Sequence, residues 1–213
     1  MYIEKTRETP AVAQGLWAGL LKAYQSRNDT DRLIFVCCKG GSRCRVQMYA
    51  KTGTGDTGSS IPSWKEILSC DGYAGRNGIG KQAEGDFKTP DGTFRCVEAF
   101  GILEDPGTQV PYTKLMPYHY WSREPETYNR MVDMRKLRRI PDGEHLIDMD
   151  PEYHYALVIG YNPGNIVGKG SAIFLHCTGS NPYTAGCIAV SEADMKTVLK
   201  NVTAGTRICI YPE

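Results

Sequence analysis

Long apolar segments are absent from this sequence of 213 residues. Its apolar runs are much shorter than the roughly 20 residues that a membrane-spanning helix needs, so we predict no membrane span. The first ten residues, MYIEKTRETP, also lack the apolar centre of a signal peptide. A formal net charge of +1 gives no basis for binding nucleic acid or an anionic membrane surface, and we predict neither partner.

Metal-binding and nucleotide-binding patterns are also missing. The eight cysteines contain no C-x-x-C pair, and no HExxH motif includes His145 or His154, so we predict no metal site. A GxGxxG pattern occurs within residues 51–60, but no helix pattern follows it, so we interpret this segment as a flexible hairpin connection. We expect most of the cysteines to be reduced residues of strands.

Short apolar runs separated by turn signals predict a strand-rich domain, which a chain of this length can stabilise with one core. Lys39-Gly40-Gly41-Ser42 predicts a turn between the first two strands. The near-continuous apolar run at 155–161 predicts a central strand. The expected strands are 33–38, 45–49, 64–69, 93–101, 155–161, 172–176, 188–190 and 207–211.

Two helices are expected at the periphery. Thr9-Pro10 is typical of a helix start, and the apolar residues Val12, Leu16, Leu20 and Tyr24 follow at helical spacing, which predicts a helix over 10–25. Packing on its own domain is favoured over docking to a partner. Ser191 and Asp194 form a capping pattern before a second helix that ends by Gly205.

Three intervening segments have a polar or irregular pattern. Residues 105–130 are rich in aromatic residues, proline and glycine, which fits either a lid beside a site or a layer covering the sheet. Residues 131–139 predict a solvated charged face. Residues 80–92 are too polar for a core and predict a loop.

One segment combines residue types that carry chemistry. An apolar run ends at His176, and Thr184-Ala185-Gly186-Cys187 opens a second run after a polar loop. A thiol attacks as thiolate, which a nearby imidazole can generate. Glycine beside the thiol leaves backbone N–H groups accessible for an oxyanion. From the residues alone, a nucleophilic pair and two buried structural residues are comparable alternatives.

Two motifs carry a family resemblance. The stretch around His176 and Cys187 resembles the catalytic motif of L,D-transpeptidases of the YkuD type, in which a strand-end His precedes a Ser/Thr-His-Gly-Cys turn. Upstream, residues 72–78 and 80–94 resemble the family segment G-K…EGD-x-x-TP-x-G-x-F, and the two motifs occur in the expected order. The resemblance covers residues 31–213, which implies an N-terminal helical extension over residues 1–30.

The resemblance implies a mainly β fold, with a β-sandwich or mixed sheets and two peripheral α-helices. It implies a cysteine-dependent L,D-transpeptidase, here a monomer, that acts on peptidoglycan stem tetrapeptides in the cell envelope without a cofactor. Cys187 would be the nucleophile and His176 the base. Thr184 would either orient His176 or be a loop hydroxyl that bonds to the local backbone. The oxyanion site would be the backbone at Ala185 and Gly186, together with the N–H of Cys187. Possible substrate-binding residues are Tyr155, Tyr161, His154 and Lys81, and either tyrosine could also add to the oxyanion site.

The sequence departs from the family pattern in three ways. Ala185 replaces the second His of the motif, the gap from His to Cys is short, and Ala189 replaces a common Arg. These departures indicate a divergent branch and leave two alternatives open. One is an L,D-carboxypeptidase that hydrolyses the same acyl-enzyme, and the other is a non-catalytic peptidoglycan-binding relative. A sortase, with Arg207 as its arginine, is disfavoured because sortases separate His and Cys much further.

Overall fold

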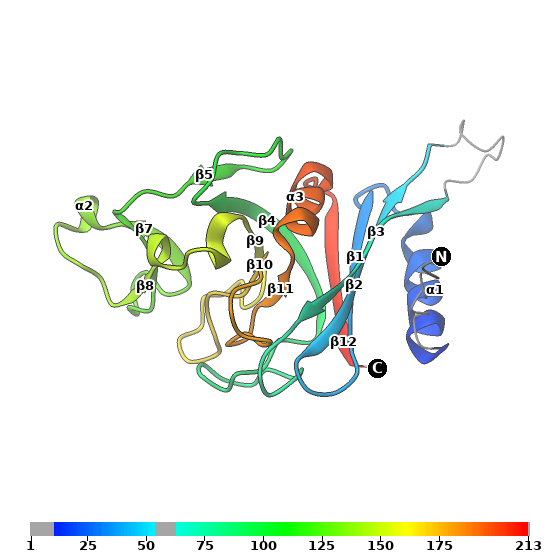
Figure 1. The fold of residues 1–213 in the computed structure, drawn as a ribbon, viewed down its shortest axis with the longest axis horizontal. Helices are drawn as coiled ribbons and strands as arrows, with labels where there is room; N and C mark the ends of the chain where they lie inside the picture. The colour runs from blue at the N-terminus through cyan, green and yellow to red at the C-terminus, as the bar shows by residue number, and fades with distance from the viewer. Residues whose placement is uncertain (1–10, 54–62, 213) are drawn as a thin grey trace, which may run out of the picture.

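The computed structural model describes residues 11–53 and 63–212, and in this part of the chain it is mainly β (Figure 1). The α-helices are α1 (Ala11–Gln25), α2 (Met134–Leu137) and α3 (Glu192–Asn201), and the short 3-10 helices are η1 (Leu146–Asp148) and η2 (Glu152–His154). The strands are β1 (Arg32–Cys38), β2 (Arg43–Lys51), β3 (Trp64–Tyr73), β4 (Gly92–Gly101), β5 (Tyr112–Lys114), β6 (His119–Ser122), β7 (Arg130–Asp133), β8 (Gly143–His145), β9 (Ala156–Ile159), β10 (Phe174–Cys177), β11 (Ile188–Val190) and β12 (Thr206–Pro212).

Nine strands form one mixed sheet that closes on itself. Their order is β12-β1-β2-β3-β11-β10-β9-β4-β5, and β12 also pairs with β4, so eight strands form a ring with β5 outside it. The pairs β1–β12, β10–β11 and β4–β5 are parallel, and the other pairs are antiparallel. Closure leaves these eight strands without a free edge. The expected mixed-sheet fold class is confirmed, and the predicted central strand β9 lies between β10 and β4.

Alternating side chains of each strand enter different cores, which explains the strands that are buried on both faces. In β1, Ile34 and Val36 enter the core inside the ring, whereas Leu33 and Phe35 pack outside it, toward α1. In β10, Leu175 belongs to the inner core and its neighbour Phe174 to a third cluster. The third cluster lies between the ring and the segment from 115 to 153, and it includes Cys187.

Helix α1 packs on the outer face of β1, which agrees with the favoured alternative (Figure 1). The Trp17 ring stacks on Phe35 with 4.6 Å between ring centroids, and Leu20 and Tyr24 pack beside them. The predicted apolar face was wrong at Leu16, whose side chain is 39% exposed, because the buried residue of that turn is Trp17. The Val12 side chain lies outside the described residues.

A small second sheet, ordered β7-β6-β8, lies beside the ring and is formed by the aromatic segment and the residues after it (Figure 1). The ring of Trp121 in β6 packs against that of Phe174 with 4.7 Å between ring centroids, so part of the aromatic segment covers the large sheet. The expected number of helices was too low, because α2 lies in the segment interpreted as a charged face. Its four residues are too few for a periodic pattern, and it begins where Asp133 accepts the Arg135 N–H.

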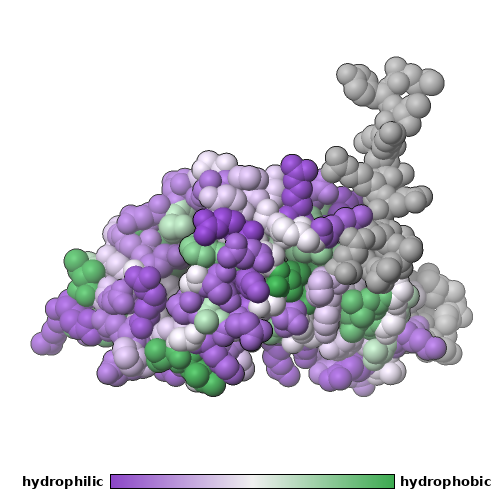
Figure 2. Space-filling model, turned by 90° about the horizontal axis from the view of Figure 1, so that it is seen from below, coloured by the Kyte–Doolittle hydropathy of each residue, from purple (hydrophilic) through white to green (hydrophobic). Residues whose placement is uncertain are grey.

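Helix α3 begins at the predicted cap. The Ser191 hydroxyl accepts the Asp194 N–H at 3.1 Å and donates to the Asp194 carboxylate at 2.5 Å. Met195, Val198 and Leu199 are buried against the ring. No helix in residues 11–53 and 63–212 is long and apolar enough to cross a membrane. Figure 2 shows a largely hydrophilic surface with small separate apolar groups, as is normal for a protein surface.

Candidate active site

His176 and Cys187 lie on one face of two neighbouring parallel strands. Leu175 pairs with Ile188 and His176 with Ala189, so Phe174 lies beside Cys187 and His176 is two residues further along. The inner core takes Leu175, Ile188 and Val190, so alternation directs His176 and Cys187 to the opposite face. With strand spacing near 4.8 Å and a rise near 3.3 Å, their Cα atoms are roughly 8 Å apart. An imidazole and a thiol can meet across that distance.

The His176 ring is fixed by its own strand. Its Nδ1 lies 2.7 Å from the carbonyl oxygen of Cys177, and a carbonyl can only accept, so Nδ1 carries the proton. Burial lowers the pKa of His176, against the effects of the Cys177 carbonyl and the Glu152 carboxylate. The imidazole is therefore neutral near pH 7, and Nε2 is its basic nitrogen. The ring of Tyr153 packs edge-on at 5.5 Å.

The Cys187 thiol is held in its protonated form. Its Sγ donates to the Ala172 carbonyl at 3.1 Å and accepts the Phe174 N–H at 3.3 Å. Burial raises the pKa of Cys187 to about 12, the Glu144 carboxylate adds to this, and the Phe174 N–H and Lys81 oppose it. The resting site therefore holds the thiol and not the thiolate that attack requires. The pair consists of a neutral thiol and a neutral imidazole.

Two threonines hold the backbone of the cysteine. The Thr184 hydroxyl donates to the Cys187 carbonyl at 2.6 Å and accepts the Gly186 N–H at 3.1 Å, and the Thr89 hydroxyl donates to the same carbonyl at 3.2 Å. The Thr184 hydroxyl thus bonds to the local backbone and not to His176, which is the second of the two alternatives for this residue. The Gly186 N–H is occupied as well. Gly186 has φ +151°, and a Cβ there would lie 2.9 Å from the Lys88 carbonyl oxygen.

A cavity of about 530 Å³ opens onto the pair. His176 and Cys187 both line it, together with the loop residues Thr184, Ala185 and Gly186. Its other walls come from β6, β8, η2 and the loop of residues 81–87. A nucleophilic pair requires the imidazole and the thiol to lie on the same side of the molecule. His176 and Cys187 meet this requirement, because both line one cavity.

The charged groups of the cavity are unevenly paired. Lys81 forms an ion pair with Asp86 at 2.8 Å, and Arg123 forms one with Asp142 at 2.8 Å. Among the described residues, the other three charged groups of the wall, which are carboxylates, have no ion-pair partner; they belong to Glu84, Glu144 and Glu152. The cavity therefore presents unneutralised negative charge to a ligand.

The candidate substrate-binding residues divide clearly. Lys81 lines the cavity, but Tyr155, Tyr161 and His154 are not among its lining residues. Tyr155 is buried in the inner core, where Lys196 lies over its ring. The Tyr161 hydroxyl donates to the Lys169 carbonyl at 2.8 Å. His154 bonds to Glu192 at 2.8 Å and Asp150 at 3.1 Å, so each group is occupied outside the cavity.

Sequence reasoning missed three residues of the site. Tyr153 and Glu144 line the cavity, and the Tyr153 hydroxyl donates to the Glu144 carboxylate at 2.5 Å. Burial raises the pKa of both groups, and Tyr153 lowers that of Glu144. Thr89 is fully buried and also accepts the Gly75 N–H at 2.8 Å. Only Thr89 had a signal, because it belongs to the upstream motif.

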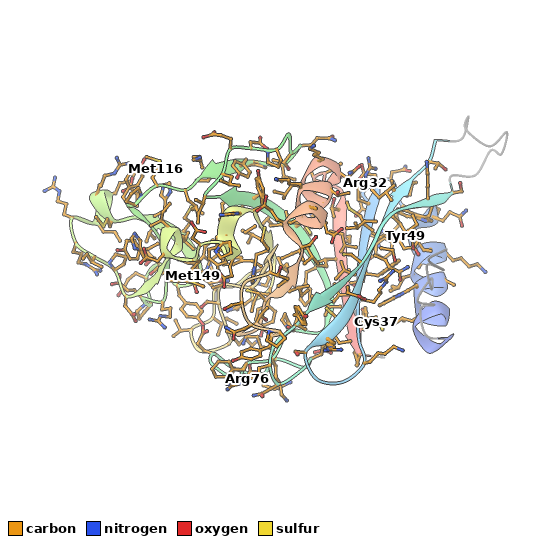
Figure 3. All side chains as sticks on the ribbon, in the orientation of Figure 1. Arg32, Cys37, Tyr49, Arg76, Met116 and Met149 are labelled. Carbon is orange, nitrogen blue, oxygen red and sulfur yellow. The ribbon has the colours of Figure 1, made fainter. Side chains whose placement is uncertain are left out.

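Arg76 packs against two aromatic rings of the cavity wall. The Arg76 guanidinium lies 4.2 Å from the ring centre of Phe87 and 5.8 Å from that of Tyr183, and both rings line the cavity. In Figure 3, the labelled Arg76 lies on the loops below the sheet, and Met149, another lining residue, lies on the segment between η1 and η2. The two residues come from different parts of the chain that enclose the site.

The profile of the YkuD family, the L,D-transpeptidase catalytic domain, matches residues 28–210. A search of curated proteins gave no significant match. A solved L,D-transpeptidase from Mycobacterium smegmatis is 13% identical with a TM-score of 0.38, over 85% of this chain and 58% of that one. L,D-transpeptidase 1 of Mycobacterium tuberculosis is 12% identical with a TM-score of 0.38, over 86% of this chain and 62% of that one.

This chain therefore spans about three fifths of the length of those two solved chains. Their low scores carry no further argument about the site. The family match covers most of the sequence and includes both of the motifs that carry the resemblance. The chain belongs to the YkuD family of L,D-transpeptidase catalytic domains.

Proposed function

We propose that this protein is a cysteine-dependent L,D-transpeptidase that acts on peptidoglycan stem tetrapeptides. The observation that carries the proposal is the placement of His176 and Cys187 on one face of β10 and β11, lining one cavity. Membership of the family supports the acyl-transfer class of reaction. The family also supports a role in the cell envelope, where peptidoglycan is found.

The reaction begins from two neutral groups. The thiol turns from the Ala172 carbonyl toward Nε2 of His176, which takes its proton as the sulfur attacks the carbonyl carbon of the third stem residue. The C–S bond forms, and the carbonyl electrons move to the oxygen. Collapse of this intermediate breaks the C–N bond, and the imidazolium gives its proton to the departing amine of D-Ala. A thioester remains on Cys187.

The second half transfers the acyl group. An acceptor amine attacks the thioester, a new C–N bond forms and the C–S bond breaks, and the proton of the amine returns to the thiol through His176. The product is a 3→3 crosslink. Because Thr184 occupies the Gly186 N–H, we assign the oxyanion to the N–H of Cys187, whose carbonyl is fixed by Thr89 and Thr184.

The charge of the cavity supports a donor that carries a cation. The unpaired carboxylates of Glu84, Glu144 and Glu152 would favour a third residue with a free amine, such as a diamino acid. Lys81 cannot neutralise them, because it pairs with Asp86. A stem peptide with a diamino acid at its third position is also the substrate class that the family implies.

The deciding experiment is an incubation with a purified tetrapeptide stem, with and without an acceptor amine, followed by mass spectrometry of protein and products. We expect a covalent adduct equal to the donor minus D-Ala, and a crosslinked product when the acceptor is present. Cys187→Ala should abolish both. Cys96→Ala is the matched control, because that cysteine is buried in the ring and absent from the cavity.

The outcomes separate the alternatives. An adduct with only hydrolysed tripeptide would indicate an L,D-carboxypeptidase. Binding of the tetrapeptide without an adduct or a product would indicate a non-catalytic relative and would overturn the proposal. An adduct that persists in Cys187→Ala would place the nucleophile elsewhere.

A further inference from the structure

The residue whose carbonyl accepts the Cys187 thiol has an unusual backbone conformation. The acceptor of the thiol is the carbonyl of Ala172, just before β10. Ala172 has φ +53°, a left-handed conformation that residues other than glycine rarely adopt and that requires support from neighbouring groups. This conformation fixes the direction of the peptide group whose oxygen accepts the thiol.

The support comes from Asn129, at the end of the loop between β6 and β7. Its Oδ1 accepts the Ala172 N–H at 3.1 Å and also the Trp121 indole N–H at 3.1 Å. Its amide nitrogen donates to the Tyr161 carbonyl at 3.4 Å. Asn129 is itself left-handed, with φ +59°, which asparagine tolerates better than most residues. One amide thus ties the small sheet to the residue that holds the thiol.

We propose that Asn129 is a positioning residue for Cys187: by holding Ala172 in its left-handed conformation, it keeps the Ala172 carbonyl on the thiol and the thiol protonated in the resting enzyme. The inference builds on the proposed function only in taking Cys187 as the nucleophile. It adds a way to regulate the reactivity of the thiol, because the loop that carries Asn129 joins two strands of the small sheet, which forms part of the cavity wall. A displacement of this loop would release the thiol toward His176.

The ionisable groups around the thiol come from several elements. They are His176 on β10, Tyr153 on η2, Glu144 on β8 and Lys81 on the loop before β4. None of them bonds to Asn129. Replacement of Asn129 by an uncharged residue therefore leaves the charged groups beside the sulfur in place and removes the hydrogen bonds of its amide to Ala172, Trp121 and Tyr161.

The test is the pH profile of Cys187 alkylation by iodoacetamide, followed by peptide mass spectrometry in the absence of any stem peptide. Asn129→Gly removes the amide, and glycine keeps φ +59° without strain. Loss of a hydrogen bond to the protonated thiol should raise the rate roughly three- to tenfold at a given pH below 10. Asn129→Asp keeps the acceptor oxygen but adds a carboxylate, which disfavours the thiolate, so its alkylation rate should not exceed that of the wild type.

A second variant separates this path from general loosening. Thr127→Val removes the 2.7 Å contact between the Thr127 and Ser122 hydroxyls in the same loop but leaves the bond from Ala172 to Asn129, and it should leave the profile unchanged. Coincident profiles for Asn129→Gly and wild type would overturn the proposal, as would an equal shift in Thr127→Val. Circular dichroism of each variant verifies the fold. No substrate is used, so this result is independent of whether the protein proves to be a transpeptidase.

Discussion

The hydroxyl of Thr89 donates to the carbonyl of Cys187 at 3.2 Å, across 98 positions of sequence. Thr89 is fully buried and also accepts the N–H of Gly75 at 2.8 Å. A single hydroxyl therefore joins the upstream motif to the cysteine-bearing strand, and it does so with both its donor and its acceptor. This bond therefore connects the two motifs directly in the folded chain.

Thr89→Val should destabilise the protein by about 1–3 kcal/mol. The substitution keeps the shape of the side chain but leaves the buried Gly75 N–H without its acceptor. Urea denaturation measures the change. Thr89→Ser keeps the hydroxyl and is the control. A Thr89→Val protein as stable as the wild type would show that water or another group replaces the hydroxyl.

Alkylation of Cys187 should be slow near neutral pH. Burial raises the pKa of Cys187 to about 12, so the thiolate is a very small fraction at pH 7 and grows about tenfold with each pH unit up to that value. Rates measured by peptide mass spectrometry from pH 6 to pH 10.5 should therefore rise continuously. A plateau starting near pH 7 would contradict the environment described for the resting thiol.

Stability should fall in alkaline solution, because the cysteine thiols ionise at a lower pH in the unfolded chain than in the folded protein. Burial raises the pKa of Cys70, Cys96 and Cys177 to about 12 and of Cys209 to about 11, whereas an unfolded thiol ionises near 8.5–9. A raised folded pKa gives stability that is complete below about pH 9 and is lost between about pH 9 and pH 12. Each thiol contributes up to about 1.4 kcal/mol per pH unit.

Urea denaturation at pH 7.5, 9 and 10.5, under reducing conditions, measures this slope. Cys96→Ala should lower the stability at pH 7.5 and reduce the slope above pH 9, because one of the buried thiols is gone. Equal stability of the wild type at pH 7.5 and 10.5 would contradict the expected linkage.

Glu144→Gln should weaken the use of donors whose third residue carries a free amine. If the unpaired Glu144 carboxylate attracts that amine, we expect KM to rise by about tenfold, equivalent to about 1.4 kcal/mol, with little change in kcat. Donors with an acetylated amine should show the same KM in both proteins. A KM that rises equally for both donors would mean that Glu144 shapes the cavity through Tyr153 instead.

Trp17→Ala should cost about 3–5 kcal/mol if α1 is part of the folded unit. Trp17 is 4% exposed and stacks on Phe35. Leu16→Ala is the matched control in the neighbouring position, and it should cost less than about 1 kcal/mol because Leu16 is 39% exposed. Thermal denaturation of the two variants compares them. Similar losses would indicate that α1 contributes through helix propensity and not through this contact.

Local patterns were sufficient to predict the elements that carry the reacting pair. The apolar run that ends at His176 and the short apolar run at Ile188–Val190 predicted both strands, and Ser191 predicted the start of α3. Turn chemistry also predicted the β1–β2 hairpin. These features depend on neighbouring residues, whose side-chain preferences can be read directly from sequence.

The surroundings of the pair depend on distant residues and could not be predicted in this way. Tyr153 and Glu144 reach the cavity from η2 and β8, which have no periodic signal because each has three residues. The roles of Tyr155, Tyr161 and His154 were expected from the family resemblance, and the structure places their contacts elsewhere. The burial that raises the pKa of Cys187 also arises from segments far away in the chain.

The pairing of β10 with β11 has a consequence for how members of this family can diverge. Register between the two strands, and not the number of residues linking them, determines how far the base is from the nucleophile. The exposed positions 180–183 could therefore lengthen or shorten while the reacting atoms keep their separation. Insertions and deletions in the loop between β10 and β11 can therefore change the rim of the cavity, and the short loop of this protein is compatible with unchanged chemistry.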